Sequence, residues 1–95
     1  MPKGYIIGHV TVTNAEAYQE YIVRDTPLIA AFGGKPLVRG GASQEVEGEP
    51  FSRHVIFEFP DYESAKALYN DPEYQEVAQI RRDNATSMIV LVEGV

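Results

Sequence analysis

The sequence contains no cysteine and no tryptophan, and its basic residues are few: eight Lys and Arg stand against fourteen Asp and Glu, which gives a net charge of −6. Without cysteine the chain cannot form disulfides, thiolate metal sites or a cysteine nucleophile. A nucleic-acid partner is not expected either, because phosphate backbones are bound by clustered positive charge and the cations here are scattered along the chain.

Long hydrophobic runs are also missing. No apolar stretch is long enough to cross a bilayer as a helix, so no membrane partner is expected. The opening residues MPKGYIIGHVTV lack the charged start, apolar run and small-residue cleavage site typical of a signal peptide, which favours a cytoplasmic location. With 95 residues, 44% of them hydrophobic and 23% charged, the composition is typical of one folded domain over residues 1–95.

Residues 53–59, RHVIFEF, predict a central strand, because they are rich in β-branched and aromatic side chains and stop before Pro60. Alternate residues of a strand point to opposite faces of the sheet. One face of this strand is apolar and suits a layer of helices: it carries Val55, Phe57 and Phe59. The other face carries the titratable side chains of His54 and Glu58, so it either meets water or lines a site.

The first half of the chain predicts two more strands and a helix. Residues 4–13 alternate as a strand that places Tyr5 and His9 on its more polar face. The capping-box pair Thr13 and Glu16 predicts the start of a helix, which should kink or restart at Pro27 and end at residues 33–34, Gly-Gly.

Residues 35–39 predict a second strand, which should bulge at Gly40 and Gly41 and resume extended character over residues 43–47. The turn chemistry of residues 48–50 should then fold it back as a hairpin onto the strand at 53–59.

In the second half, Asp61 should cap a helix, and Asp71 followed by Pro72 should end it near Asn70 and start it again. Residues 86–93 predict the closing strand. The order strand, helix, strand, strand, helix, strand predicts a ferredoxin-like α+β fold, with a four-stranded antiparallel sheet and both helices on one face.

Four stretches carry a resemblance that runs over nearly the whole chain: KGYIIGHVTV, AYQEYIVRDTPLIAAFGGKPLVRGGA, VIFEFPDYESAKALYNDPEYQEVAQIRR and IVLVEGV. The sequence resembles the family called domain of unknown function 1330, within the dimeric α+β barrel superfamily. This resemblance implies a homodimer in which two sheets face each other as a barrel. It supplies no catalytic residues, and the wider superfamily includes cofactor-independent monooxygenases, haem-degrading enzymes and isomerases, so fold-level analogy carries little about chemistry.

The face of the sheet away from the helices should carry a polar set: Tyr5, His9, Arg39, His54 and Glu58. Titratable groups enclosed in a barrel need mutual contacts, water or a ligand. Arg39 could hold a carboxylate or phenolate, and His9 could move a proton as the candidate catalytic residue. The alternative is that these groups are solvated or make dimer contacts, with Glu58 paired to a cation on a neighbouring strand.

Three residues of the second helical region are candidates for the mouth of the cavity: Tyr69, Tyr74 and Arg81. The alternative is favoured for each: the tyrosines pack in the helix core, and the stem of Arg81 packs while its head pairs with an acid. With two histidines far apart in the sequence, no metal site is expected, and no cofactor motif is present. Three functions remain open. They are binding of a small anionic or aromatic metabolite, a monooxygenase-like or isomerase-like enzyme with His9 as base, and a structural or interaction module.

Overall fold

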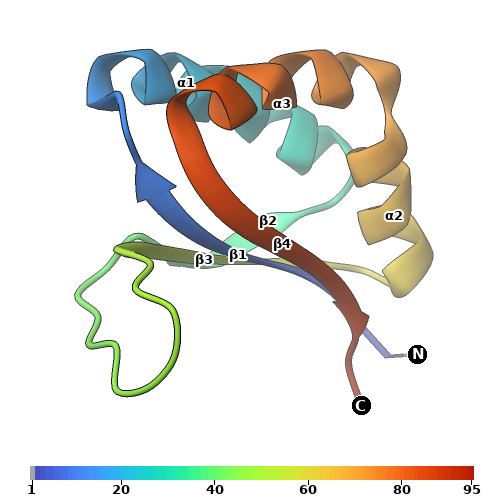
Figure 1. Cartoon of the computed structure of the whole chain (residues 1–95). Coiled ribbons are helices and arrows are strands. Elements are labelled where there is room, and N and C mark those ends of the chain that lie inside the picture. Colours follow the sequence, from blue (N-terminus) through green and yellow to red (C-terminus); the bar gives the residue numbers. More distant parts are fainter. Residues whose placement is uncertain (1) are drawn as a thin grey trace.

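The structure, a computed structural model, describes residues 2–95. The elements are β1 (Gly4–Val12), α1 (Ala15–Ala31), β2 (Lys35–Arg39), β3 (Arg53–Phe59), α2 (Tyr62–Asn70), α3 (Pro72–Asn84) and β4 (Ala85–Glu93). The strands form one antiparallel sheet in the order β2-β3-β1-β4, with all three helices on one face (Figure 1). This is the expected ferredoxin-like α+β fold, and β3 is an interior strand, as predicted. Within residues 2–95, no helix is both long enough and apolar enough to span a membrane.

The start of α1 differs from the prediction by one residue. Asn14, rather than Thr13, is the N-cap, because its side-chain oxygen accepts a hydrogen bond from the Ala17 N–H at 3.2 Å. The helix does not restart at Pro27, since α1 continues through it. The proline removes a bond to the carbonyl of Val23, a residue on the solvent-facing side of the helix, where water can replace that bond.

The predicted break between the second and third helices is confirmed. Asp61 caps α2 by accepting from the Ser64 N–H at 2.7 Å, and Asp71 caps α3 by accepting from the Tyr74 N–H at 3.1 Å. Pro72 occupies the first turn of α3, where its missing N–H costs no hydrogen bond. Two local signals in the sequence therefore divide this helical region into α2 and α3.

The core lies between the helices and the sheet. Phe59 of β3 and Leu68 of α2 are essentially inaccessible to solvent, and so are Val10 of β1 and Val77 of α3. Fully burying an aliphatic or aromatic side chain of this size stabilises the fold by about 1.5–3 kcal/mol. No helix covers the opposite face of the sheet, which we call the open face. The long loop of residues 40–52, green in Figure 1, lies on this side of the sheet.

The second strand corrects two expectations. β2 ends at Arg39, and residues 43–47 are exposed loop rather than strand. The irregularity lies between Pro36 and Val38, not at Gly40 and Gly41. A bulge changes which face the following residues occupy. As a result Arg39 lies opposite Val55 and faces the helices, so its predicted place on the open face is wrong.

Candidate functional site

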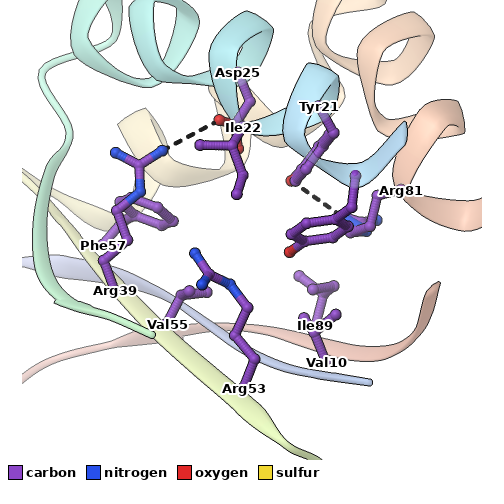
Figure 2. A pocket seen from close by; sticks show the side chains of 11 residues that line it. Val10, Tyr21, Ile22, Asp25, Arg39, Arg53, Val55, Phe57, Arg81 and Ile89 are labelled. Carbon is purple, nitrogen blue, oxygen red and sulfur yellow. Dashed lines mark hydrogen bonds and ion pairs between the residues drawn. The ribbon is translucent and has the colours of Figure 1, made fainter. Parts of the chain in front are cut away.

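A small cavity lies between the sheet and the helices α1 and α3 (Figure 2). Its volume is about 20 Å³, which is room for about one water molecule. Apolar side chains from every strand but β2, and from α1, form much of its wall. The polar residues of the wall are Tyr18, Tyr21, Asp25, Arg39, Arg53 and Arg81.

The charges around this cavity do not balance. Three arginines, one each from β2, β3 and α3, surround it with a single carboxylate, Asp25 of α1. Asp25 and Arg81 are each only 3% exposed. In a chain of net charge −6, the cavity thus collects two more positive than negative charges. Asp25 and Arg81 are the buried charges of this set and are opposite in sign, while Arg39 and Arg53 are partly exposed and carry the excess at the edge of the cavity.

Asp25 is held loosely by its neighbours. Its Oδ1 lies 3.5 Å from the Arg39 Nη2 and 3.5 Å from the Thr26 hydroxyl, both at the long limit of a hydrogen bond. The Arg39 Nη2 makes its shorter bond, 2.6 Å, to the Thr26 hydroxyl. Burial raises the pKa of Asp25 to about 6, against the opposing effect of the Arg39 charge. Hydrogen bonds from the Tyr21 and Thr26 hydroxyls also lower this pKa, so the carboxylate is shared among these hydroxyls and Arg39.

Arg81 is fixed by two tyrosines. Its Nη1 donates to the Tyr21 hydroxyl at 3.4 Å, its guanidinium lies 5.6 Å from the centre of the Tyr21 ring, and the Tyr21 and Tyr74 hydroxyls are 3.0 Å apart. Burial raises the pKa of Tyr21 well above its ordinary value and also raises that of Tyr74, so both remain neutral. The buried Nε of Arg81 has no hydrogen-bond partner.

Arg53 repeats this arrangement on β3. Its buried Nε also lacks a partner, and its guanidinium lies 5.8 Å from the centre of the Tyr18 ring. Gly40 packs directly against this guanidinium: it has φ +72°, and a Cβ there would collide with Nη1 of Arg53. Glycine at this position therefore allows both the turn after β2 and the close approach of Arg53.

The residues predicted from the sequence divide between the two faces of the sheet. Four lie on the open face as expected and form two pairs there. The Tyr5 hydroxyl donates to Glu58 at 3.1 Å, with Lys35 3.4 Å from the same carboxylate, and the Nδ1 atoms of His9 and His54 lie 2.9 Å apart. The alternative prediction, that Glu58 pairs with a cation on a neighbouring strand, is confirmed: the cation is Lys35 of β2.

The other predicted residues, Arg39, Tyr69, Tyr74 and Arg81, lie on the helix side. Arg39 and Arg81 line the cavity, and Tyr74 contacts it through Tyr21. Tyr69 packs against the core, with its ring centre 6.0 Å from that of Tyr74. His9 is therefore separated by the sheet from Arg39, with which it was expected to share one face.

A second, wider hollow of about 510 Å³ opens between His9, His54 and the loop of residues 40–52. His54 lies 3.9 Å from Glu45 of that loop. Across residues 2–95, no group of three or more His, Cys, Asp or Glu side chains is placed to hold a metal ion.

Asp25 and Arg53 were not predicted, although the sequence contained a signal for each. Asp25 follows Tyr18 and Tyr21 at helical spacing, so it belongs to the buried stripe of α1. Arg53 is two residues before Val55, so strand alternation places both on the helix face. A charged residue inside an apolar stripe is the pattern that would have found both.

The family profile of the domain of unknown function DUF1330 matches residues 3–95. The chain belongs to the DUF1330 family. The match covers all seven elements and every residue of the cavity, so the DUF1330 domain and the folded unit described above coincide. No match to this DUF1330 chain is found among curated proteins.

Solved structures with the same fold include a protein of unknown function from Rhodopseudomonas palustris, with a TM-score of 0.79 and 21% identity over 99% of this chain and 83% of that one. SnoaB, a cofactor-independent oxygenase from Streptomyces nogalater, has a TM-score of 0.64 and 15% identity over 97% and 92%. A dimeric ferredoxin-like protein of unknown function from Thermobifida fusca has a TM-score of 0.65 and 12% identity over 97% and 91%. At these identities the likeness establishes the fold alone.

Proposed function

We propose that this DUF1330 protein binds a small organic anion in the cavity between the sheet and the helices α1 and α3. Arg39, Arg53 and Arg81 supply the positive charge. The observation that carries this proposal is the pair of buried Nε–H groups, on Arg53 and Arg81, that border the cavity without a hydrogen-bond partner. Buried donors are nearly always paired, so two unpaired guanidinium donors beside one cavity point to a missing acceptor.

An anion suits these donors better than water does. Leaving a buried donor unpaired costs about 1–3 kcal/mol, and more when the group is charged. A carboxylate can accept from more than one guanidinium donor, and it also offsets the excess positive charge. The cavity as it stands has room for about one water molecule, so an anion as large as acetate requires the wall to open, and the 27% exposed side chain of Arg39 is the place where it can do so.

The test compares acids with their uncharged amides at constant ionic strength. Ligand-observed NMR should detect saturable binding of acetate and propionate but not of acetamide or propionamide. Arg81→Met removes the charge and all the N–H donors of the side chain while keeping an unbranched apolar stem, so it should weaken acetate binding about tenfold or more.

Arg82→Met is the matched control for this test, because Arg82 is the next residue of α3 but is exposed and bonds to Gln75 instead. It should leave binding unchanged. Equal binding of acids and amides, or equal losses in the two variants, would contradict the proposal, since either result would mean that the cavity arginines do not select the anion.

We also propose that the open sheet face pairs with a second copy of the chain. Its centre is apolar: Ile7 lies beside Ile56 and Val90, with Val38 beyond Ile56. Val38 and Val90 remain 39% and 40% exposed. One structure of the same fold is described as dimeric, which supports self-association of this chain.

Sedimentation velocity tests this dimer. Ile7→Glu places a charge at the centre of the face and should convert a dimer to a folded monomer. Glu20→Gln, an exposed change on α1, should have no effect on assembly. A wild-type protein that sediments as a monomer at all concentrations would refute the paired-sheet arrangement.

Enzymatic chemistry is a second candidate, favoured by the acceptor position of Asp25 beside the cavity. Any base that acts on an anion held by the arginines is Asp25 rather than His9, because His9 lies on the other face of the sheet. SnoaB shows that this fold can carry out oxygenation without a cofactor. Consumption of oxygen with phenolic acids, abolished by Asp25→Asn and retained by His9→Asn, would support this second function.

A further inference from the structure

The open face of the sheet carries a cross-strand cluster that the anion site does not use. Met88, His9 and His54 form one row across the neighbouring strands β4, β1 and β3 (Figure 1). Side chains directly opposite each other in antiparallel strands share a face, with Cβ atoms about 4.5–5.5 Å apart. All three residues line the wide hollow beside the loop of residues 40–52. We call these three residues the His–Met row.

The two imidazoles of the row already face each other through Nδ1. The Nδ1 atoms of His9 and His54 are 2.9 Å apart, and the two ring planes are inclined by 71°. Two imidazole nitrogens that bind one metal ion at about 2.0–2.1 Å lie about 3–3.5 Å apart. A small rotation of either ring therefore lets a metal ion replace the shared hydrogen. That hydrogen moves to Nε2 of the same ring, so both imidazoles stay neutral and no proton is lost.

The surroundings of the pair favour a bound cation. Glu45 lies 3.9 Å from Nε2 of His54, which is too long for a hydrogen bond. Its charge nevertheless favours a proton on Nε2 and so leaves Nδ1 free as a ligand. Three glutamates line the hollow, and among the described residues that line it none is a lysine or an arginine. The charge of the hollow therefore attracts cations.

The third residue of the row selects the kind of metal. Met88 is 48% exposed, and its thioether is a soft ligand. Soft thioether ligands select copper(I), whereas imidazole alone also suits zinc, nickel and iron. Zinc is bound by Cys, His, Asp and Glu, and within residues 2–95 no group of three such side chains is placed to hold a metal ion. The row therefore suits copper(I) better than zinc.

We propose that His9, His54 and Met88 bind one copper(I) ion on the open face of the sheet. The ligands are the two Nδ1 atoms and the thioether sulfur. The site lies on the other side of the sheet from Asp25 and the arginines, so it does not depend on the proposed anion binding. No metal site was expected from the sequence because the histidines are 45 residues apart, and only the register of β1 with β3 brings them together.

Competition with the copper(I) chelator bicinchoninate, without oxygen and at neutral pH, measures the affinity. The wild type should retain one copper(I) per chain. Loss of an outer-shell partner of a metal ligand typically costs about 10–100-fold in affinity, so loss of a ligand should cost about tenfold or more. We expect this loss from His54→Asn and from Met88→Leu. Val92→Leu, on the same strand and face but opposite Tyr5, is the control and should have no effect.

Zinc separates a thioether ligand from a general effect on the fold. Met88→Leu should leave the weaker binding of zinc to the two histidines unchanged, and an equal loss of both metals would overturn the proposal. Met88→His places a third imidazole in the row and should tighten zinc binding about tenfold or more. Misfolding cannot produce this gain, so the variant decides the question even if Met88→Leu does not fold. The absence of a gain would contradict the convergence of the row.

Silver(I), a soft cation that stays in one oxidation state, identifies the ligands in the wild-type protein. The chain has only two histidines, so their ring nitrogens are easily distinguished by NMR. Both Nδ1 signals should shift and saturate at one equivalent of silver nitrate in chloride-free buffer. Complete loss of copper(I) to equimolar bicinchoninate, unchanged copper(I) binding by Met88→Leu, or a response at Nε2 in place of Nδ1 would each overturn the proposal.

Discussion

Replacing Asp25 with asparagine should stabilise the protein at neutral pH, although the change removes a charged partner of Arg39. Burial raises the pKa of this carboxyl from 3.8 to about 6. The folded state therefore binds the proton more tightly than the unfolded chain does. Between about pH 4 and about pH 6, folding is favoured by proton uptake, and the ionised carboxylate is a cost above that range.

The size of this cost follows from the pKa change. A rise from 3.8 to about 6 corresponds to about 3 kcal/mol at about 1.4 kcal/mol for each factor of ten. The free energy of unfolding of the wild type should thus fall by up to this amount as the pH rises from about 4 to about 6. Above about pH 6, Asp25 should cause no further change. Asparagine does not titrate, so Asp25→Asn should be more stable than wild type by about 1–3 kcal/mol at neutral pH and by little near pH 4.

Urea denaturation of both proteins at several pH values measures this difference directly. Taking the difference between the two proteins removes the titration of the other carboxylates, which both share. Glu20→Gln on the exposed face of α1 is the control and should show no comparable change with pH. A variant that is less stable than wild type at neutral pH, or a difference that does not vary with pH, would refute the view that Asp25 is a poorly compensated buried carboxylate.

Two further predictions concern the frame of the cavity. Gly40→Ala should destabilise the fold by about 1–2 kcal/mol or more, because the new Cβ collides with Arg53 and the backbone has φ +72°. Gly41→Ala, with nothing within 4 Å of its Cβ, should be neutral in the same urea titration, and equal losses would contradict the close packing of Arg53. Tyr74→Phe should cost about 1 kcal/mol through the lost bond to Tyr21, without change in secondary structure by circular dichroism, and unchanged stability would mean that this hydroxyl pair is not formed.

The elements of the fold could be predicted because their signals are local. The composition of residues 53–59 marks a strand, and Asp61, Asp71 and Pro72 mark helix starts by capping chemistry alone. The alternation of β1 correctly placed Tyr5 and His9 on the open face. The sequence did not predict the register between β1 and β3, which brings His9 opposite His54.

The candidate site was predicted less well, and one bulge explains most of the error. Strict alternation from Lys35 assigns Arg39 to the open face, and the irregularity between Pro36 and Val38 reverses that assignment. The bulge was predicted at Gly40 and Gly41 because glycines often mark bulges, but the glycine at position 40 instead allows the close approach of Arg53. Arg81, placed at the cavity mouth or in an ion pair with an acid, is instead buried beside Tyr21.

The central claim is that the unpaired Nε–H groups of Arg53 and Arg81 bind an anion. The most direct measurement is the arginine side-chain nitrogen–proton spectrum of the protein during a titration with acetate at constant ionic strength. The Nε signals of Arg53 and Arg81 should shift downfield and saturate together, while those of the exposed Arg24 and Arg82 stay in place. Shifts that are linear in acetate, or equal for all four arginines, would show that the cavity does not bind the anion.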